Sequence, residues 1–204
     1  MLRRLIGRTP RARKVSALEQ LVTDDIVEFG YCDLAPISDR RFQVIRRDER
    51  DFGDSVEVSW LIRTQTTLLQ LQPGLNQNAG DLIVKSALER PQVEAVFDMR
   101  AFVTVFHEGF TPHIPLARGA GGLAGEFADW LDVEGYTQNV DARPGRARVA
   151  PGGSWVDYDL YMLQGRSCPG RTVEIEVYRN ETDVFLCRAL PDHVIERIWP
   201  AGGT

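Results

Sequence analysis

The sequence predicts an α+β protein, mainly antiparallel β, organised as a tandem repeat of two barrel-like or sandwich-like β units, each closed by a strand and a short helix. Three observations support this prediction. Two similar segments recur about 100 positions apart, apolar and polar residues alternate with a period of two over much of the chain, and a stretch rich in glycine and proline separates the halves. We therefore expect a basic flexible segment 1–15, a first unit 16–108, a linker 109–122 and a second unit 123–204.

The strongest sign of a repeat is that residues 81–97 align without a gap to residues 183–199. Four identities are Asp81, Ala87, Leu88 and Glu94, which recur as Asp183, Ala189, Leu190 and Glu196. The alternating stretch 56–62 has a similar counterpart at 156–162. Each copy is expected to be an apolar strand followed by a short helix, with Val93, Phe97, Ile195 and Trp199 buried against the sheets.

The first unit is expected to begin with a helix over about 17–22, because Ser16 and Glu19 have the spacing of a capping box. Alternation then predicts strands at 26–29, 42–45, 56–62, 67–72 and 81–88, with a turn at 51–54. Pro91 is tolerated in a first helical turn, and the helix that it opens is expected to continue through 102–106.

The second unit is expected to begin with an amphipathic helix at 123–133, since Leu123, Phe127, Trp130 and Leu131 fall at helical spacing. Turns are predicted at 143–146 and 151–153, and strands at 156–162, 173–177 and 184–190. The last of these strands is apolar on both faces, so we expect it to be central and buried.

Composition limits the class of protein. Hydrophobic residues make up 43% of the chain, which is enough for a sizeable core, and the sequence contains no long apolar run and no signal-peptide pattern. A cytoplasmic location is the resulting expectation. Three cysteines at wide spacings fit neither a disulfide framework nor a metal motif, so we expect reduced thiols, with Cys187 in a core.

Positive charge is concentrated in the first fourteen residues, which contain six basic residues and no acid, although the whole chain has a net charge of −5. The basic candidates for interaction are Arg3, Arg4, Arg8, Arg11 and Arg13. Such a tail could bind an anionic membrane surface, which would place the protein at the periphery of the inner membrane, or it could bind nucleic acid. The competing interpretation is a mobile terminus. The acidic body argues against nucleic-acid binding by the folded part.

Only one pair of histidines lies close in sequence. His107 and His113 flank Glu108, and two imidazoles with a carboxylate are ligands that zinc accepts, so a metal site or a hydrolase centre is one hypothesis. The spacing matches no standard motif, and an ordinary loop is the competing interpretation. No catalytic constellation and no cofactor motif is found elsewhere.

Four carboxylates in the second unit, Asp157, Asp159, Glu174 and Glu176, alternate with apolar residues along two predicted strands. We expect them to share one acidic sheet face. Such a face could attract a basic partner, or it could be an ordinary solvated surface.

The strand-sized pieces 25–29, 158–163 and 173–177 resemble uncharacterised bacterial β-rich domains of unknown function that are often encoded near phage-shock-type membrane-stress proteins. The resemblance implies a barrel-like β module without catalytic residues. The leading hypothesis is accordingly a non-enzymatic bacterial adaptor or interaction module with a protein partner, linked to envelope stress. The alternatives are a metal-binding protein or hydrolase using the histidine loop, and membrane or nucleic-acid binding through the tail.

Overall fold

The computed structural model describes residues 15–74, 81–107, 113–117, 127–149 and 152–201, and most of its regular structure is antiparallel β, as predicted. The strands are β1 (Ile26–Phe29), β2 (Arg41–Asp51), β3 (Val56–Arg63), β4 (Leu68–Pro73), β5 (Asp81–Leu88), β6 (His113–Ile114), β7 (Tyr136–Val149), β8 (Val156–Gly165), β9 (Arg171–Val177), β10 (Thr182–Pro191) and β11 (Ile195–Trp199). The helical elements are η1 (Val15–Gln20), α1 (Arg90–Val96), α2 (Met99–Phe102), η2 (Val103–Phe106) and η4 (Asp192–Val194).

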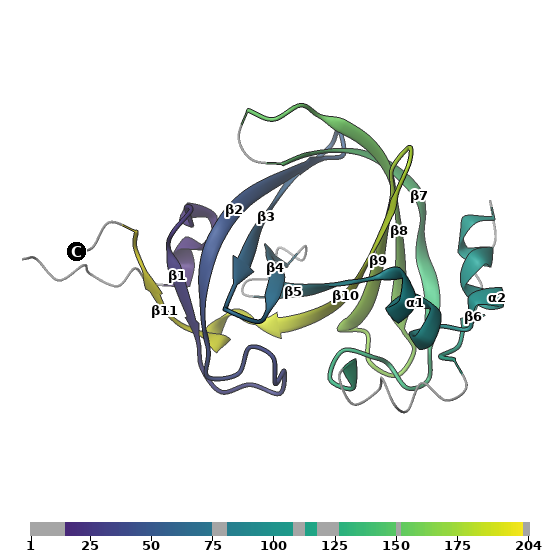
Figure 1. Ribbon diagram of the computed structural model, residues 1–204, viewed down its shortest axis with the longest axis horizontal. Coiled ribbons are helices and arrows are strands. Elements are labelled where there is room, and N and C mark those ends of the chain that lie inside the picture. The colour runs from purple at the N-terminus through teal and green to yellow at the C-terminus, as the bar shows by residue number, and fades with distance from the viewer. Residues whose placement is uncertain (1–14, 75–80, 108–112, 118–126, 150–151, 202–204) are drawn as a thin grey trace, which may run out of the picture.

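Eight of these strands form a closed ring of hydrogen-bonded neighbours. The sheet runs β11-β1-β2-β3-β4-β5-β10-β9-β8-β7-β6, and β2 also pairs with β7, which joins the two sides. The long strand β2 makes this possible because its first half pairs with β1 and its last four residues pair with β7, with a register shift after Val44 between the two parts. Figure 1 looks through the ring, with β1 and β11 outside β2, and α1 and α2 outside the opposite wall.

The apolar core lies on the outer face of the ring. Strand registers place Trp60, Leu71 and Val84 on this face, and all three are fully buried. Segments outside the sheet cover them. For example, the Trp60 indole Nε1 donates a hydrogen bond to the Leu21 carbonyl oxygen, at 3.1 Å. Burial of the apolar side chains on the outer face therefore stabilises the ring, and the inner face carries polar residues.

One buried carboxylate ties a covering loop to the hairpin between β8 and β9. Asp132 accepts hydrogen bonds from the backbone amides of Ser167 (2.8 Å) and Cys168 (2.7 Å), and from the Ser167 hydroxyl (2.7 Å). Burial alone would raise the pKa of Asp132, but these bonds outweigh it and lower the pKa. The ionised carboxylate thus acts as a structural anchor.

The predicted tandem repeat is not shown by the structure. The two similar strands β5 and β10 pair directly with each other, Leu186 lying opposite Ser86, so strands of both predicted units share one sheet. The second copy also ends differently, because residues 195–199 form strand β11 rather than a helix. Ile and Trp favour strands, and pairing with β1 supplies the backbone partners that a short helix would have lacked.

Burial at the repeat positions is closer to expectation. Val93, Phe97 and Ile195 are buried, and Trp199 is half-buried. The single helix expected from Pro91 onward is instead divided into α1, α2 and η2, because Phe97 leaves the helix to form a bridge with Leu116.

Three further expectations require correction or fall outside the described residues. The turn predicted at 143–146 lies within β7, where Pro144 precedes the residues that pair with β2, so its missing N–H does not interrupt that pairing. In the predicted linker, 113–117 pairs with β7 and with Phe97 rather than only connecting two units. The helix predicted at 123–133 lies partly outside the described residues, and of its described part only Phe127 is helical, with a turn following at 128–130. Phe127, Trp130 and Leu131 are nevertheless buried.

Candidate functional site

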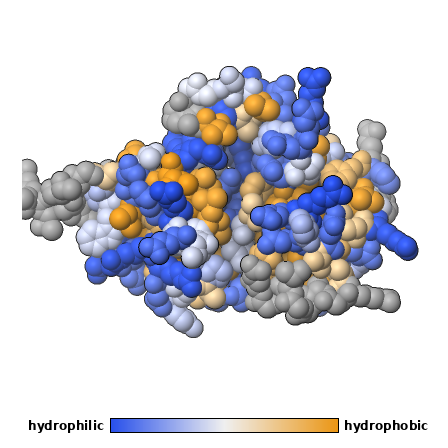
Figure 2. All heavy atoms as spheres, viewed as in Figure 1, coloured by the Kyte–Doolittle hydropathy of each residue, from blue (hydrophilic) through white to orange (hydrophobic). Residues whose placement is uncertain are grey.

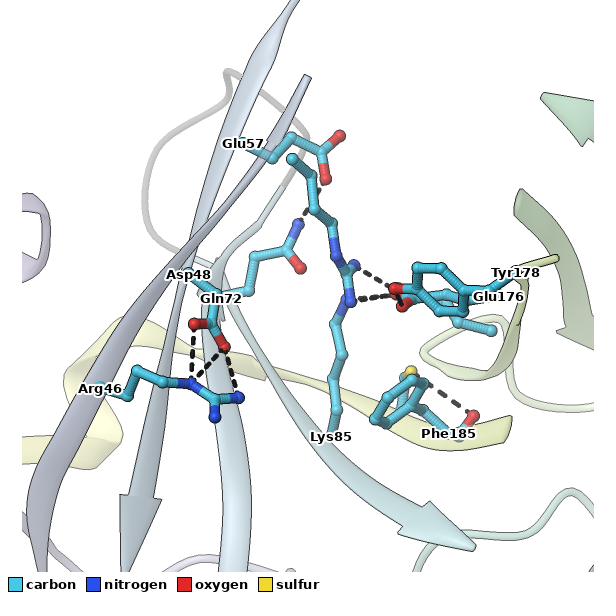
Figure 3. A network of polar contacts seen from close by, with 11 residues as sticks. Arg46, Asp48, Glu57, Gln72, Lys85, Glu176, Tyr178 and Phe185 are labelled. Atoms are coloured by element: carbon cyan, nitrogen blue, oxygen red, sulfur yellow. Dashed lines mark hydrogen bonds and ion pairs between the residues drawn. The ribbon is translucent and has the colours of Figure 1, made fainter. Parts of the chain in front are cut away.

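The inner face of the ring carries a buried polar cluster, which we define as Arg50, Lys85, Glu174 and Glu176. Strand register brings them together: Lys85 of β5 lies opposite Cys187 of β10, and the neighbouring inward residue Phe185 lies opposite Glu174 of β9. Arg50 reaches the same place from β2. Figure 3 shows side chains of this region converging between β2, β3, β5 and β9.

The cluster is held by short ion pairs. Lys85 Nζ lies 2.6 Å from Glu174 Oε2, and Arg50 Nη1 lies 3.1 Å from the same oxygen. Arg50 also forms an ion pair with Glu176, whose other oxygen accepts a hydrogen bond from the Tyr178 hydroxyl at 2.6 Å. Since the Lys85 side chain is 0% exposed, its ammonium depends on these partners for its stability.

The pKa directions follow from this pairing and from burial. Burial by itself disfavours the charged form of Glu174, but Lys85 and Arg50 outweigh it and lower its pKa. Burial, reinforced by the charge of Glu176, raises the pKa of the Tyr178 phenol, and burial also raises the pKa of the inward-facing Cys187 thiol. The thiol is therefore neutral near pH 7 and is not activated as a nucleophile. It is one of three free cysteines, as predicted.

Glu57 and Gln72 lie beside the cluster at one part of the wall. Gln72 Nε2 donates a hydrogen bond to Glu57 Oε2 at 2.9 Å, and the two side chains face each other in Figure 3. Burial raises the pKa of Glu57, while Lys85 and Arg50 oppose this shift. This carboxylate is thus only partly compensated by the buried cations.

One end of the ring carries an aromatic groove of about 580 Å³. The rings of Tyr158 and Tyr178 stack with centroids 5.4 Å apart, and Phe52 meets Tyr158 edge-on at 6.0 Å. The guanidinium of Arg143 lies 4.1 Å from the centre of the Phe52 ring. These groups contact one another rather than leaving an open aromatic cage.

A second groove, of about 650 Å³, lies outside the ring between the helices and the β9–β10 hairpin. Its floor is apolar and includes Leu88, Val93, Met99, Phe102 and Val184. Val103 and Phe106, on its border, are 48% and 39% exposed. Figure 2 shows the mixture of apolar and hydrophilic residues on one face of the molecule. We call this feature the helix groove.

The predicted histidine site lies partly outside the described residues. His107 caps the end of η2 and His113 begins β6, and both are exposed, whereas Glu108 lies outside the described residues. Within the part of the chain that the structure describes, no three His, Cys, Asp or Glu side chains are grouped so that they could hold a metal ion. A metal site involving Glu108 stays a prediction.

The predicted acidic face is wrong as a single surface. Register pairs Asp159 with Val177 and Leu160 with Glu176, so Asp159 and Glu176 point to opposite faces of the sheet. Asp157 and Asp159 are exposed, and Glu174 and Glu176 are buried in the polar cluster. A period-two pattern distinguishes the faces of a strand, but it does not say which polar face meets solvent. The five arginines proposed for interaction, Arg3, Arg4, Arg8, Arg11 and Arg13, lie outside the described residues.

Sequence analysis missed Arg50, Lys85, Glu57 and Gln72 as members of one site. A signal existed for Lys85, which is a lone lysine inside an otherwise apolar strand in a chain with only two lysines. A charged residue in the middle of a buried strand requires a buried partner of opposite charge. The identity of that partner depended on the ring and could not be read from spacing.

Comparisons with protein-family models, curated proteins and solved structures yield no match to this chain. Among the described residues, no helix is long and apolar enough to cross a membrane. The function is therefore argued from the geometry of the cluster, the grooves and the surface.

Proposed function

We propose that the chain is a non-enzymatic interaction module, an adaptor whose closed ring is a rigid scaffold and whose helix groove binds an apolar segment of a protein partner. The observation that carries the proposal is the exposure of Val103 and Phe106 beside a continuous apolar floor. Exposed apolar side chains grouped beside a groove are typical of protein-binding surfaces.

Charge on the rim of the groove favours an uncharged apolar partner segment. Arg90 and Glu94 of α1 form an ion pair at 2.8 Å, and the opposite rim carries Arg179 and Glu181 of the β9–β10 hairpin. Each rim therefore carries one positive and one negative charge. A strongly basic or acidic segment would gain little electrostatic binding energy from these rims, whereas an amphipathic segment could bury its apolar side chains on the floor of the groove.

The polar cluster supports a scaffold role for the ring. Its carboxylates accept bonds from Lys85 and Arg50, and Cys187 is buried with a raised pKa. Groups that bind one another in this way are better suited to hold strands than to act on a substrate. The bacterial setting and the link to envelope stress come from the sequence resemblance alone and stay predictions.

Display of a random peptide library tests the proposal, because such a library samples partner segments of every composition. Selected peptides should be rich in apolar residues, and their binding should be lost in the variant Phe106→Glu. The matched control is Val133→Glu, which adds the same charge at a valine that is 81% exposed elsewhere. Failure to select any binding peptide, or binding that is equal in the two variants, would count against the helix groove as the docking surface.

A further inference from the structure

The wall of the ring has an opening between β3 and β4. Pairing between these strands covers only Trp60–Arg63 and Leu68–Leu71, so β3 residues 56–59 pair with β2 but with no residue of β4. A groove of about 640 Å³ lies over this place. It is lined by Glu57 and Gln72 from the inner face, and by surface residues that include Glu19, Val56 and Val58. We call it the side opening.

An unpartnered buried acceptor belongs to a residue that lines the side opening. Gln72 is 2% exposed, and its Oε1 has no hydrogen-bond partner among the described residues. The amide nitrogen of the same side chain donates to Glu57, which fixes the orientation of the amide and leaves the carbonyl oxygen as the unused atom. A buried acceptor without a donor is unfavourable, and a ligand N–H would satisfy it.

Charge at the side opening favours a cation. The inner face carries Glu57, Glu174 and Glu176 together with Arg50 and Lys85, and Asp48 of the same face is paired with Arg46. The ion pairs of Arg50 and Lys85 go to the two fully buried glutamates. Glu57 accepts a hydrogen bond from the neutral Gln72 amide, and Lys85 and Arg50 compensate its charge only in part.

The arginines on the outer rim are paired with other carboxylates. Arg143 Nη2 lies 2.9 Å from Asp54 Oδ1, and Arg47 forms an ion pair with Glu49. A ligand in the side opening would thus meet a carboxylate whose charge is only partly compensated.

We infer that the side opening binds an organic primary ammonium group, whose N–H groups bond to the Glu57 carboxylate and to Gln72 Oε1 while its apolar stem lies against Val56 and Val58. An ammonium has three donors and matches the two acceptors, and the valines provide apolar surface next to them. The wall supplies one carboxylate and one amide oxygen, fewer oxygen ligands than a calcium or magnesium ion requires. This inference concerns a different face from the helix groove and does not depend on it.

Isothermal titration of the full chain with n-butylammonium near neutral pH tests the inference, with n-butanol and tetramethylammonium as controls that lack the charge or the donors. Butylammonium should bind with one-to-one stoichiometry and the controls should not. Glu57→Gln should weaken binding at least about tenfold, since it removes a charge-assisted hydrogen bond. Glu19→Gln removes the same charge from the exposed rim of the same groove and should leave the affinity unchanged.

Thermal unfolding separates loss of binding from loss of folding. Glu57→Gln should be at least as stable as the parent chain, because it removes a partly compensated charge from a largely buried position.

Nα-acetyl-lysine amide carries the same ammonium head, so its binding would assign a protein lysine as the natural source, and binding of butylammonium alone would assign a free amine. Absence of binding, equal binding to the Glu57→Gln variant, equal weakening by Glu19→Gln, or equal competition by potassium ions would overturn the inference.

Discussion

Replacing Lys85 by methionine removes the central cation of the polar cluster while keeping a side chain of similar length. The ammonium has no exposure to solvent and lies 2.6 Å from Glu174 Oε2. The substitution leaves Glu174 buried with one remaining cationic partner, Arg50, at 3.1 Å. We expect a large loss of stability that arises from the carboxylate left behind and not from lost packing.

The magnitude follows from the number of partners that remain. Removing one member of a buried ion pair costs about 3–5 kcal/mol, because the other charge stays desolvated and uncompensated. Arg50 still stabilises Glu174, so we expect a value near the lower end, about 3 kcal/mol. In a chain of this size that corresponds to a fall in Tm of about 6–12 °C.

Urea unfolding followed by tryptophan fluorescence measures this loss, and the double variant Lys85→Met with Glu174→Leu serves as its control. When both charges are removed no uncompensated carboxylate remains, so the double variant should be more stable than Lys85→Met alone by at least about 1 kcal/mol. A loss below about 1 kcal/mol for Lys85→Met, or a double variant less stable than either single variant, would refute the reasoning.

The same pair predicts a pH dependence. The folded-state pKa of Glu174 is lowered, so its contribution is present above the ordinary glutamate pKa of 4.5 and is lost as the pH falls through the lowered value. The stability difference between the parent chain and Lys85→Met should therefore shrink in acid. An unchanged difference across that range would show that Glu174 is not the origin of the effect.

Three further predictions concern other parts of the fold. A Cβ at Gly145 would lie 2.9 Å from carbon atoms of the Phe52 ring, so Gly145→Ala should destabilise the chain by about 1–3 kcal/mol in the same urea assay. Asp132→Asn should lower stability by about 1–3 kcal/mol near neutral pH, and this gap should close as the pH falls below the ordinary aspartate pKa of 3.8, because the lowered pKa makes its contribution one of the ionised form. Titration with a thiol reagent should modify the two partly exposed cysteines in the native chain, whereas Cys187 should react only after unfolding. A Gly145→Ala variant as stable as the parent chain would contradict the close approach of Phe52. A stability difference for Asp132→Asn that persists in acid would contradict the role of the ionised carboxylate, and rapid labelling of Cys187 in the native chain would contradict its burial.

Local patterns predicted most of the strands because alternation is a property of neighbouring residues. The stretches at 26–29, 56–62 and 81–88 are strands, and the turn at 51–54 joins β2 to β3. Strand β7 was missed because Pro144 and Gly145 interrupt its pattern. Glycine is required there because the Phe52 and Tyr158 rings approach its backbone closely.

The candidate sites were harder to predict than the strands. The histidine loop and the acidic residues were chosen from spacing along the chain, yet the polar cluster joins residues from β2, β5 and β9. Lys85 and Glu174 are separated by 89 positions, and no local rule connects them. Glu57 and Gln72 are on neighbouring strands, but their position beside a groove depends on where β3–β4 pairing ends.

The sequence by itself determined that the chain is mainly antiparallel β with free thiols and a buried Cys187, because hydrophobic periodicity and residue size act over a few residues. Only the tertiary structure decided which face of each strand is inside. Pairing of β2 with β7 closes the ring, and that closure places Glu174 and Glu176 in the interior, where Lys85 and Arg50 must neutralise them. A charge on a strand is favourable or costly according to what lies opposite, and that is fixed by contacts between distant parts of the chain.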